Sequence, residues 1–475
     1  MEEPASYTVS KTASVVEQLA SLFPPAQLKT DADSLLHYGR DWTRVHEPSP
    51  LAVVLPRTVD EVIALVKLAV QLGFALVPSG GRTGLSGGAV AINGEVVVAF
   101  DRMNRILDFN PIDRMLTCEA GVVTEQLQQF AEQQGLLYPV DFASAGSSQI
   151  GGNVSTNAGG IKVIRYGMTR NWVQGLKVVT GSGELLELNK GLVKNATGYD
   201  FRHLFVGAEG TLGLIVEVTV ALTSPARDPK VMLLAVESME ATMEVLKLFQ
   251  QQLNLTAFEF FSERALNHVT SEKQLPRPFD TVAPYYCVIE FEQDSAATLE
   301  TAMSLFEAAM EAGWVTDGTL SQNSSQAAGL WRYREDISET ISRFTPYKND
   351  ISVRVSGIPG FLREVETLVN SQYPDFEIIW FGHIGDGNVH LNILKPTELE
   401  KDIFFKRCAQ VSEQIFAVVR HYDGSISAEH GVGLLKKPFL SYTRSPVEIA
   451  YMKAVKRIFD PHNIMNPGKV FDLEA

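Results

Sequence analysis

Three glycine-rich segments in the first half of the chain constrain its fold more than any other feature. The first, 78–88 (PSGGRTGLSGG), has five glycines in eleven residues and directly follows the apolar run 74–78. The second spans 146–160 and the third spans 198–213. Glycine permits a positive φ and close backbone approach, so successive N–H groups can converge on an anion such as a pyrophosphate. One such loop could equally be a flexible turn, but three together favour a cofactor site.

The common nucleotide-binding motifs are absent from these segments. A P-loop ends in Gly-Lys-Ser/Thr, which segment 78–88 lacks. The Rossmann pattern G-x-G-x-x-G is matched neither there nor at 181–183. We therefore expect no P-loop site and no NAD site of the usual kind.

Short apolar runs alternate with helical patterns along the first half, which indicates an α/β layer. We expect strands at 51–55, 74–78, 96–100, 175–180, 184–188 and 214–222, and helices at 58–69 and 123–134. Thr58, followed three residues later by Glu61, is a capping signal for the first of these helices. Pro225 and Pro229 then interrupt the chain, and we place a domain boundary there.

Repeated strand–helix units after residue 230 suggest an antiparallel sheet. We expect strands at 231–236, 285–292 and 351–355, and helices at 239–253, 296–312, 358–370, 399–422 and 445–459. The expected fold class is α+β. A cofactor-binding domain of two subdomains would span 1–227, and a second domain, an antiparallel sheet flanked by helices, would span 228–440. A helical C-terminal segment, 441–475, would return to the first domain.

Composition excludes several classes of partner. The chain has 41 Lys and Arg against 56 Asp and Glu, a net charge of −15, which makes nucleic acid an improbable ligand. No apolar run is long enough to span a bilayer, and the acidic start 1–4 predicts no signal peptide. Three cysteines lie far apart in sequence, so we expect neither a disulfide framework nor a cysteine zinc site, and a reducing cytoplasm is the default.

The glycine segments, together with 383–392, 427–433 and 466–468, resemble the flavoprotein family of vanillyl-alcohol oxidase and p-cresol methylhydroxylase. Within that family the chain is most similar to the FAD-dependent D-2-hydroxyacid dehydrogenases, over nearly its whole length from about residue 30. The resemblance implies that FAD lies extended through the first domain. It places the pyrophosphate at 79–83 and at the second glycine segment, and brings Asn466 back to the flavin.

The same resemblance implies a set of cofactor-binding residues in the glycine segments and the tail. They are Pro78, Ser79, Gly80, Gly81, Arg82, Thr83, Gly84, Gly88, Ser147, Gly151, Gly152, Asn153, Thr156, Asn157, Gly159, Gly160, Glu209, Gly210, Gly213, Ile215 and Asn466. Some relatives attach FAD covalently through a histidine in or near the first loop. The first two glycine segments contain no histidine, so we predict non-covalent FAD.

A histidine-containing hairpin is predicted at 380–393 (WFGHIGDGNVHLNI). Asp386-Gly387 is a favoured pair for a two-residue type I′ turn, and this turn would place His383 opposite His390. Cross-strand partners have Cβ atoms about 4.5–5.5 Å apart, which suits two imidazoles on one metal ion. The pair alone could equally stabilise a half-buried hairpin. Asn392 would share the face of His390.

Glu429 and His430 are adjacent in a second loop, 425–433 (SISAEHGVG). Two histidines and one carboxylate form a ligand set that leaves open positions for a substrate. Zinc is the first choice because it is redox-silent, although manganese or iron would also fit. The resemblance assigns His383, His390 and Glu429 as the metal ligands and His430 as the catalytic base. Oxidation of a 2-hydroxy acid needs such a base, because the hydroxyl proton must be removed.

Candidate residues for the substrate carboxylate lie at 330–348. Arg334 and Ser338 are spaced i, i+4, so they would share a helix face, and Lys348 adds a second cation. Spacing alone favours ordinary solvated charges. The resemblance places these three residues at the substrate carboxylate, with Asn392 and His430 at the hydroxyl. Ser338 stands where the family carries Thr, so it keeps the hydroxyl but lacks a methyl group for packing.

The resemblance implies a metal-assisted FAD-dependent dehydrogenase with a small anionic 2-hydroxy acid as substrate. D-2-hydroxyglutarate is the expected substrate, with D-malate and related D-2-hydroxy acids as further ones. The alternatives are a D-lactate or glycolate dehydrogenase on the same scaffold, and a flavoprotein oxidase that uses O₂. An electron-transfer flavoprotein is the expected acceptor. The oligomeric state stays open, with a homodimer as one option.

Overall fold

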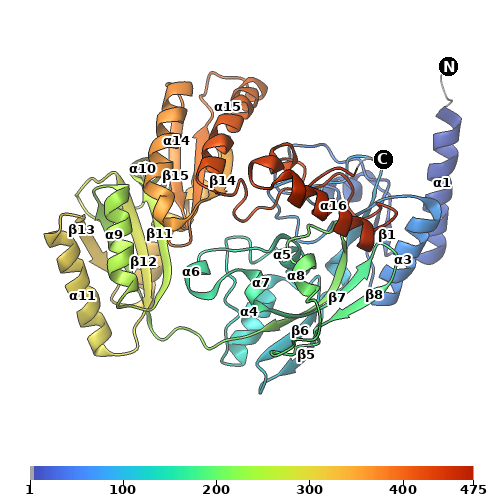
Figure 1. Ribbon diagram of the computed structural model, residues 1–475, viewed down its shortest axis with the longest axis horizontal. Helices are drawn as coiled ribbons and strands as arrows, with labels where there is room; N and C mark the ends of the chain where they lie inside the picture. The colour runs from blue at the N-terminus through green and yellow to red at the C-terminus, as the bar shows by residue number, and fades with distance from the viewer. Residues whose placement is uncertain (1–4, 474–475) are drawn as a thin grey trace.

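The computed structural model describes residues 5–473, with side chains described from residue 14. The chain forms two lobes, each built on its own sheets, with the first lobe in blue and green and the second in yellow and orange (Figure 1). The described part excludes residues 1–4 and 474–475. The expected absence of a signal peptide rests on residues 1–4 and therefore lies outside it. The predicted domain boundaries stay a prediction.

The first lobe contains two sheets. A four-stranded sheet has the order β1-β2-β4-β3, in which β2, β4 and β3 are parallel, and a five-stranded antiparallel sheet has the order β5-β6-β9-β7-β8. The strands are β1 (Leu28–Lys29), β2 (Ala52–Val54), β3 (Leu76–Ser79), β4 (Val96–Ala99), β5 (Ile106–Asn110), β6 (Met115–Glu119), β7 (Val173–Thr180), β8 (Leu185–Leu188) and β9 (Gly213–Ala221). The predicted α/β layer is therefore present as β2, α3 (Val59–Leu72), β3 and β4.

The α-helices of this lobe include the two expected at 58–69 and 123–134. The helices of the lobe are α1 (Ala5–Leu22), α2 (Ala32–Tyr38), α3 (Val59–Leu72), α4 (Thr124–Gln133), α5 (Ile150–Thr156), α6 (Val163–Tyr166), α7 (Thr169–Trp172) and α8 (Arg202–Phe205). The Thr58 side chain accepts the N–H of Glu61 at 3.2 Å and caps α3, as predicted. The helix ends at Gly73, whose φ of 67° suits glycine.

The second lobe is a seven-stranded antiparallel sheet with the order β13-β10-β12-β11-β15-β16-β14. Its strands are β10 (Pro229–Val236), β11 (Leu255–Ser262), β12 (Tyr285–Glu292), β13 (Val315–Leu320), β14 (Tyr347–Ser352), β15 (Glu377–Gly382) and β16 (Asn388–Leu394). Its helices are α9 (Met239–Gln250), α10 (Glu263–Lys273), α11 (Ala296–Glu311), α12 (Ser324–Glu335), α13 (Ile337–Ser342), α14 (Ile358–Gln372) and α15 (Lys401–His421). One hydrophobic core joins the sheet to α9, α11, α14 and α15, and another joins its opposite face to α10, α12 and α13.

The C-terminal helix α16 (Pro446–Phe459) and the residues after it pack on the first lobe (Figure 1). Phe459, Ile464 and Met465 belong to the same hydrophobic core as the first-lobe sheets. Leu76 of β3 donates its N–H to the carbonyl of Ile464 at 2.7 Å, so the tail runs beside the strand that precedes the first glycine segment.

The α+β fold class is confirmed, and the differences from the expected elements are local. Strand β14 begins four residues before the expected 351. The second glycine segment, expected as a loop, contains helix α5. We predicted no element at 255–262, where the fully buried strand β11 lies inside the sheet. Its residues are buried on both faces, so the strand lacks the alternation that identifies a half-exposed strand.

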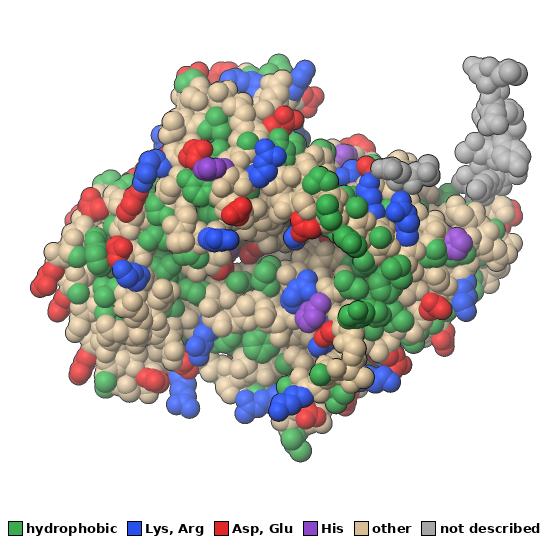
Figure 2. Space-filling view, viewed as in Figure 1, with side chains coloured by type: hydrophobic (Ala, Val, Ile, Leu, Met, Phe, Trp, Pro, Cys, Tyr) green, Lys and Arg blue, Asp and Glu red, His purple; other side chains and the backbone are tan. Residues whose placement is uncertain are grey.

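The helices, cysteines and surface charges of the described residues can be compared with the expectations from composition. Within residues 5–473, no helix is both long and apolar enough to cross a membrane. Cys118, Cys287 and Cys408 are buried and form no disulfide. Figure 2 shows acidic and basic side chains interspersed over the visible face, with a hollow between the two lobes.

Candidate active site

The glycine segments line one pocket at the first lobe. Fifteen of the predicted cofactor residues face it: Pro78, Gly80, Gly81, Arg82, Thr83, Gly84, Gly88, Gly151, Gly152, Asn153, Thr156, Glu209, Gly210, Gly213 and Ile215. The same pocket is also lined by His430, which comes from the far end of the chain. We refer to it as the glycine-lined pocket.

Glycine is required at this pocket by close backbone packing. A Cβ on Gly81 would lie 2.1 Å from the carbonyl oxygen of Ser147, so the first segment can approach the second only without a side chain. Gly210 has a φ of 71°, and a Cβ there would lie 2.4 Å from Pro78 Cγ. A Cβ on Gly152 would instead meet nothing within 4 Å. The pocket thus offers a backbone surface and free space to an extended cofactor.

Six predicted cofactor residues do not line this pocket: Ser79, Ser147, Asn157, Gly159, Gly160 and Asn466. Asn466 does return to the first lobe, but its Nδ2 donates to the carbonyls of Gly88 and Glu209, at 2.8 Å each. It therefore ties the first glycine segment to the third. Gly160 donates its N–H to Glu429 Oε1 at 2.8 Å.

Seven residues of the pocket were missed: Ser86, Ala89, Phe100, Ala120, Gln149, Ser155 and Leu214. Gln149 and Ser155 lie within the second glycine segment and could have been included as polar members of it. Gln149 Oε1 and the Ser79 hydroxyl are buried without a hydrogen-bond partner, so polar atoms beside the pocket are still available to a ligand. Phe100 and Ala120 follow strands β4 and β6 and carry no local signal.

The predicted register of the histidine hairpin is wrong. His390 pairs with Phe381, not with His383, because β15 ends at Gly382 and a loop of five residues connects it to β16. This loop contacts β11, where Gly385 donates its N–H to Phe258 O at 3.0 Å. Even so, the rings of His383 and His390 have centroids 5.3 Å apart.

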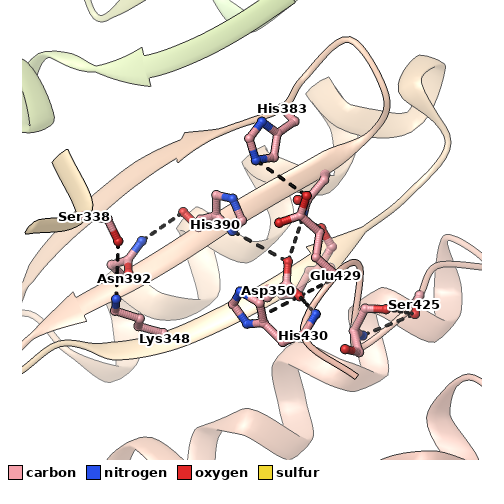
Figure 3. A network of polar contacts seen from close by, with 12 residues as sticks. Ser338, Lys348, Asp350, His383, His390, Asn392, Ser425, Glu429 and His430 are labelled. Carbon is pink, nitrogen blue, oxygen red and sulfur yellow. Dashed lines mark hydrogen bonds and ion pairs between the residues drawn. The ribbon is translucent and has the colours of Figure 1, made fainter. Parts of the chain in front are cut away.

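The Glu429–His430 loop completes a cluster beside these rings (Figure 3). Nitrogen atoms of His383 and His390 and a carboxylate oxygen of Glu429 all lie within 4.8 Å of one another. His383 Nε2 is 3.7 Å from Glu429 Oε1. Zinc ligands lie about 2 Å from the ion. The three side chains are therefore slightly farther apart than they would be around a bound ion. Their donor atoms, two imidazole nitrogens and one carboxylate oxygen, fit a divalent metal ion.

Asp350 of β14 positions this loop. Its Oδ2 accepts the backbone N–H groups of Glu429 at 2.9 Å and His430 at 3.1 Å, and its Oδ1 accepts Asn388 Nδ2 at 2.9 Å. Asp350 is also the strand partner of His390. This carboxylate therefore connects both halves of the cluster (Figure 3).

Electrostatics set the charge of the cluster. Burial alone would raise the pKa of Asp350, but His430, Lys436 and His390 outweigh it and hold that pKa below its usual range. Burial lowers the pKa of His430 to about 4, against the opposing effect of Asp350, so this ring is neutral at neutral pH. Burial would also lower the pKa of His383, but Glu259 and Glu429 raise it to about 9. A cation that binds His383 must therefore displace a proton.

A second carboxylate holds the same loop from the first lobe. Glu209, buried in the third glycine segment, accepts the N–H groups of Val432 at 2.7 Å and Gly433 at 2.8 Å. Because Glu209 also lines the glycine-lined pocket, the loop is fixed directly beside that pocket. His430 consequently faces the pocket on one side and the histidine cluster on the other.

The predicted substrate residues lie together beside the cluster. Lys348 is the strand partner of Asn392, and Lys348 Nζ is 3.4 Å from Ser338 Oγ. Arg334 and Ser338 do not share one helix as expected, because α12 ends at Glu335 and α13 starts at Ile337. The Arg334 side chain is 7% exposed and forms an ion pair with Glu259 at 2.8 Å.

Glu259 and Asp350 are the two important residues that the sequence analysis missed. Glu259 is the only charged residue of β11, a strand that is buried throughout, and such an isolated carboxylate is a usable signal for a buried ion pair. Asp350 lies two residues after Lys348, so alternation along a strand would have placed both on one face.

Comparison with known proteins identifies the family. Residues 50–189 match the family model described as FAD binding domain, and residues 226–470 match the model described as FAD linked oxidases, C-terminal domain. A protein of Stutzerimonas stutzeri (strain A1501) named D-2-hydroxyglutarate dehydrogenase is 59% identical over 457 residues, which cover 96% of this chain and 98% of that protein. The chain belongs to the FAD-linked oxidases. It is accordingly an FAD-dependent oxidoreductase, and its first two glycine segments lie within the residues matched as FAD binding domain.

Another curated relative and two solved structures are also similar to this chain. A mitochondrial protein of Danio rerio, also named D-2-hydroxyglutarate dehydrogenase, is 34% identical, with 94% of this chain and 83% of that protein covered. Among solved structures, p-cresol methylhydroxylase superposes with a TM-score of 0.76 at 14% identity, covering 98% of this chain and 97% of that one. The 4-ethylphenol oxidase of Gulosibacter chungangensis has a TM-score of 0.77 at 14% identity, with 97% of each chain covered. These structures show that the chain has the fold that the resemblance implies.

The glycine-lined pocket generates a direct prediction. In Gly152→Leu a side chain would occupy the free space beside the backbone of α5, so we expect the purified protein to contain little or no FAD. Flavin absorbance per chain measures this, with Gly329→Leu as the matched control because a Cβ on Gly329 in α12 also meets nothing within 4 Å. A Gly152→Leu protein with the flavin content of the wild type would contradict the placement of FAD here.

Proposed function

We propose that this FAD-dependent oxidoreductase oxidises D-2-hydroxyglutarate to 2-oxoglutarate, with D-malate and related D-2-hydroxy acids as further substrates. The observation that carries the proposal is the position of His430, which lines the glycine-lined pocket and also adjoins the His383–His390–Glu429 cluster. A base beside both a flavin pocket and a cation-binding cluster suits the oxidation of a hydroxyl-bearing carbon. The substrate is supported by the names of relatives that are 59% and 55% identical to this chain.

We propose His383, His390 and Glu429 as ligands of a divalent metal ion, with zinc as first choice and manganese or iron as alternatives. A bound divalent ion acts as a Lewis acid that lowers the pKa of the substrate hydroxyl. The Gly160 N–H bonded to Glu429 and the Asp350 carboxylate beside the loop keep these side chains in place. Three protein ligands would leave coordination positions open for the 2-hydroxy acid.

His430 is the proposed base for the hydroxyl proton. The glycine-lined pocket would hold FAD, which would supply the acceptor, at flavin N5, for the hydride of the α-carbon. His430 is neutral at neutral pH because it is buried, so one ring nitrogen is free to accept the proton. Its Nδ1 lies 3.5 Å from Asp350 Oδ2, and this carboxylate would stabilise the imidazolium that forms. Hydride loss and proton loss together convert the hydroxyl carbon to the ketone.

Arg334, Ser338, Lys348 and Asn392 are the proposed contacts of the substrate carboxylate and hydroxyl. Arg334 Nη2 is paired with Glu259, but Arg334 Nε is buried without a hydrogen-bond partner, which leaves a donor for an anion. Lys348 and Ser338 are in contact with each other, and Asn392 lies beside Lys348 on β16.

The proposal extends to the partners and location. An electron-transfer flavoprotein as the acceptor of the two electrons is supported by the family resemblance. A reducing cytoplasm is supported by the three buried cysteines, which form no disulfide.

Anaerobic mixing with a panel of D- and L-2-hydroxy acids tests the proposed activity. D-2-hydroxyglutarate should bleach the flavin absorbance of the metal-replete protein, because the hydride has no acceptor beyond the flavin. Chelation should slow this bleaching and added zinc should restore it. A flavin that stays oxidised with D-2-hydroxyglutarate but is bleached by D-lactate, or peroxide release in air at the full turnover rate, would refute the assignment.

The role of His430 is tested by His430→Gln. We expect turnover to fall by roughly 10²–10⁴-fold, the usual contribution of a general base, with flavin and metal content unchanged. Steady-state kcat is the measurement, and His421→Gln, at the exposed end of α15, is the matched control. Turnover at the level of the wild type would exclude His430 as the base.

The attachment of FAD is tested by acid precipitation. Within the described residues, the pocket lining contains one histidine, His430, and no cysteine, so we expect all flavin to remain in the yellow supernatant. Yellow colour that persists in the washed pellet would show a covalent bond.

A further inference from the structure

Glu259 is a buried carboxylate with two partners at the candidate active site. Its side chain is 1% exposed, and it projects from β11 between His383 and Arg334. Glu259 Oε1 lies 2.9 Å from His383 Nδ1, and Oε2 lies 2.8 Å from both His383 Nδ1 and Arg334 Nη2. A carboxylate in an apolar strand costs several kcal/mol in lost hydration, so it is retained only where its neighbours compensate.

The contact with His383 determines which ring nitrogen can bind a cation. A carboxylate accepts hydrogen bonds, so Nδ1 of His383 must carry the proton that faces Glu259. The proton that a cation displaces is then the one on Nε2, which leaves the lone pair there, and Nε2 is the atom that faces Glu429 at 3.7 Å. A carboxylate that fixes the tautomer and orientation of a ligand histidine raises the basicity of that histidine.

The contact with Arg334 adds a link to the proposed substrate site. The guanidinium lies over the Phe381 ring, with Arg334 Cζ 4.8 Å from the ring centroid, and the ion pair with Glu259 holds it there. Phe381 is in turn the strand partner of His390. One carboxylate thus orients both a proposed metal ligand, His383, and a cation proposed to bind the substrate, Arg334.

We propose that Glu259 is a positioning residue that fixes the Nε2 lone pair of His383 toward the divalent cation and anchors Arg334 beside it. This inference rests on the proposed function, because it requires the metal ion assigned there. It assigns Glu259 no contact with the ion or with the substrate.

Glu259→Gln tests the proposal, since a glutamine keeps the shape but loses the charge. We expect the apparent affinity for zinc, measured by competition with a chelator, to fall about 10–100-fold, the usual effect of losing such a partner. Raising the zinc concentration should restore flavin reduction at saturating substrate, while KM stays elevated because Arg334 is released. Thermal midpoints of both proteins, compared at saturating zinc, measure whether the fold is intact.

Glu290→Gln is the matched control. Glu290 is buried on the neighbouring strand β12, forms an ion pair with Lys162 and accepts Trp331 Nε1 at 2.9 Å, but does not contact the histidine cluster. We expect its zinc affinity to remain within about twofold of the wild type. A purely structural role of Glu259 would make the two variants alike in zinc affinity, and that result would overturn the proposal.

A crystal structure of the zinc-loaded wild type provides a test that needs no variant. We expect His383 to bind zinc through Nε2 and to donate Nδ1–H to Glu259, and binding through Nδ1 would overturn the proposal. A wild type that binds no divalent ion would refute the metal part of the proposed function and this inference with it. If the wild type binds zinc and Glu259→Gln binds it with equal affinity, only this inference is refuted and the proposed metal site stands.

Discussion

The buried carboxylate of Asp350 is the interaction on which the candidate active site depends. Its side chain is 1% exposed, and it accepts the N–H groups of Glu429 and His430 and the amide of Asn388. Such a carboxylate is stable only where donors and cations replace its lost hydration. In return, two adjacent backbone N–H groups gain an acceptor, and the loop that carries a proposed ligand and the proposed base is held against β14.

The two lobes share this loop. Asp350, in the second lobe, accepts the backbone N–H of Glu429 in this loop. Glu209, in the first lobe, accepts the backbone N–H groups of Val432 and Gly433. Gly160, at the end of the second glycine segment, adds a hydrogen bond to the Glu429 side chain. The FAD-binding domain and the histidine cluster therefore meet at one loop, and a proposed proton acceptor on that loop serves a site that neither lobe forms alone.

Charge in the site is closely balanced although the chain carries a net charge of −15. The proposed substrate is a dianion, so the field of the whole protein would not attract it. Arg334 is already paired with Glu259, and Lys436 lies 3.7 Å from Asp350, so the carboxylates of the site offset much of its positive charge. A bound divalent ion would supply the local excess that a dianion needs.

Local signals in the sequence determined much of this protein: the capped helix α3, the glycine segments that line the pocket, and the residues of the histidine cluster. These features depend on neighbours in the chain, on the φ freedom of glycine and on the ligand chemistry of each side chain. Tertiary structure alone decided the hairpin register, because Phe258 of β11 binds the loop at Gly385. It also decided the roles of Glu259 and Asp350. The partners of a buried carboxylate come from strands and loops that are distant in sequence, and no local sequence pattern indicates which of these residues will be in contact.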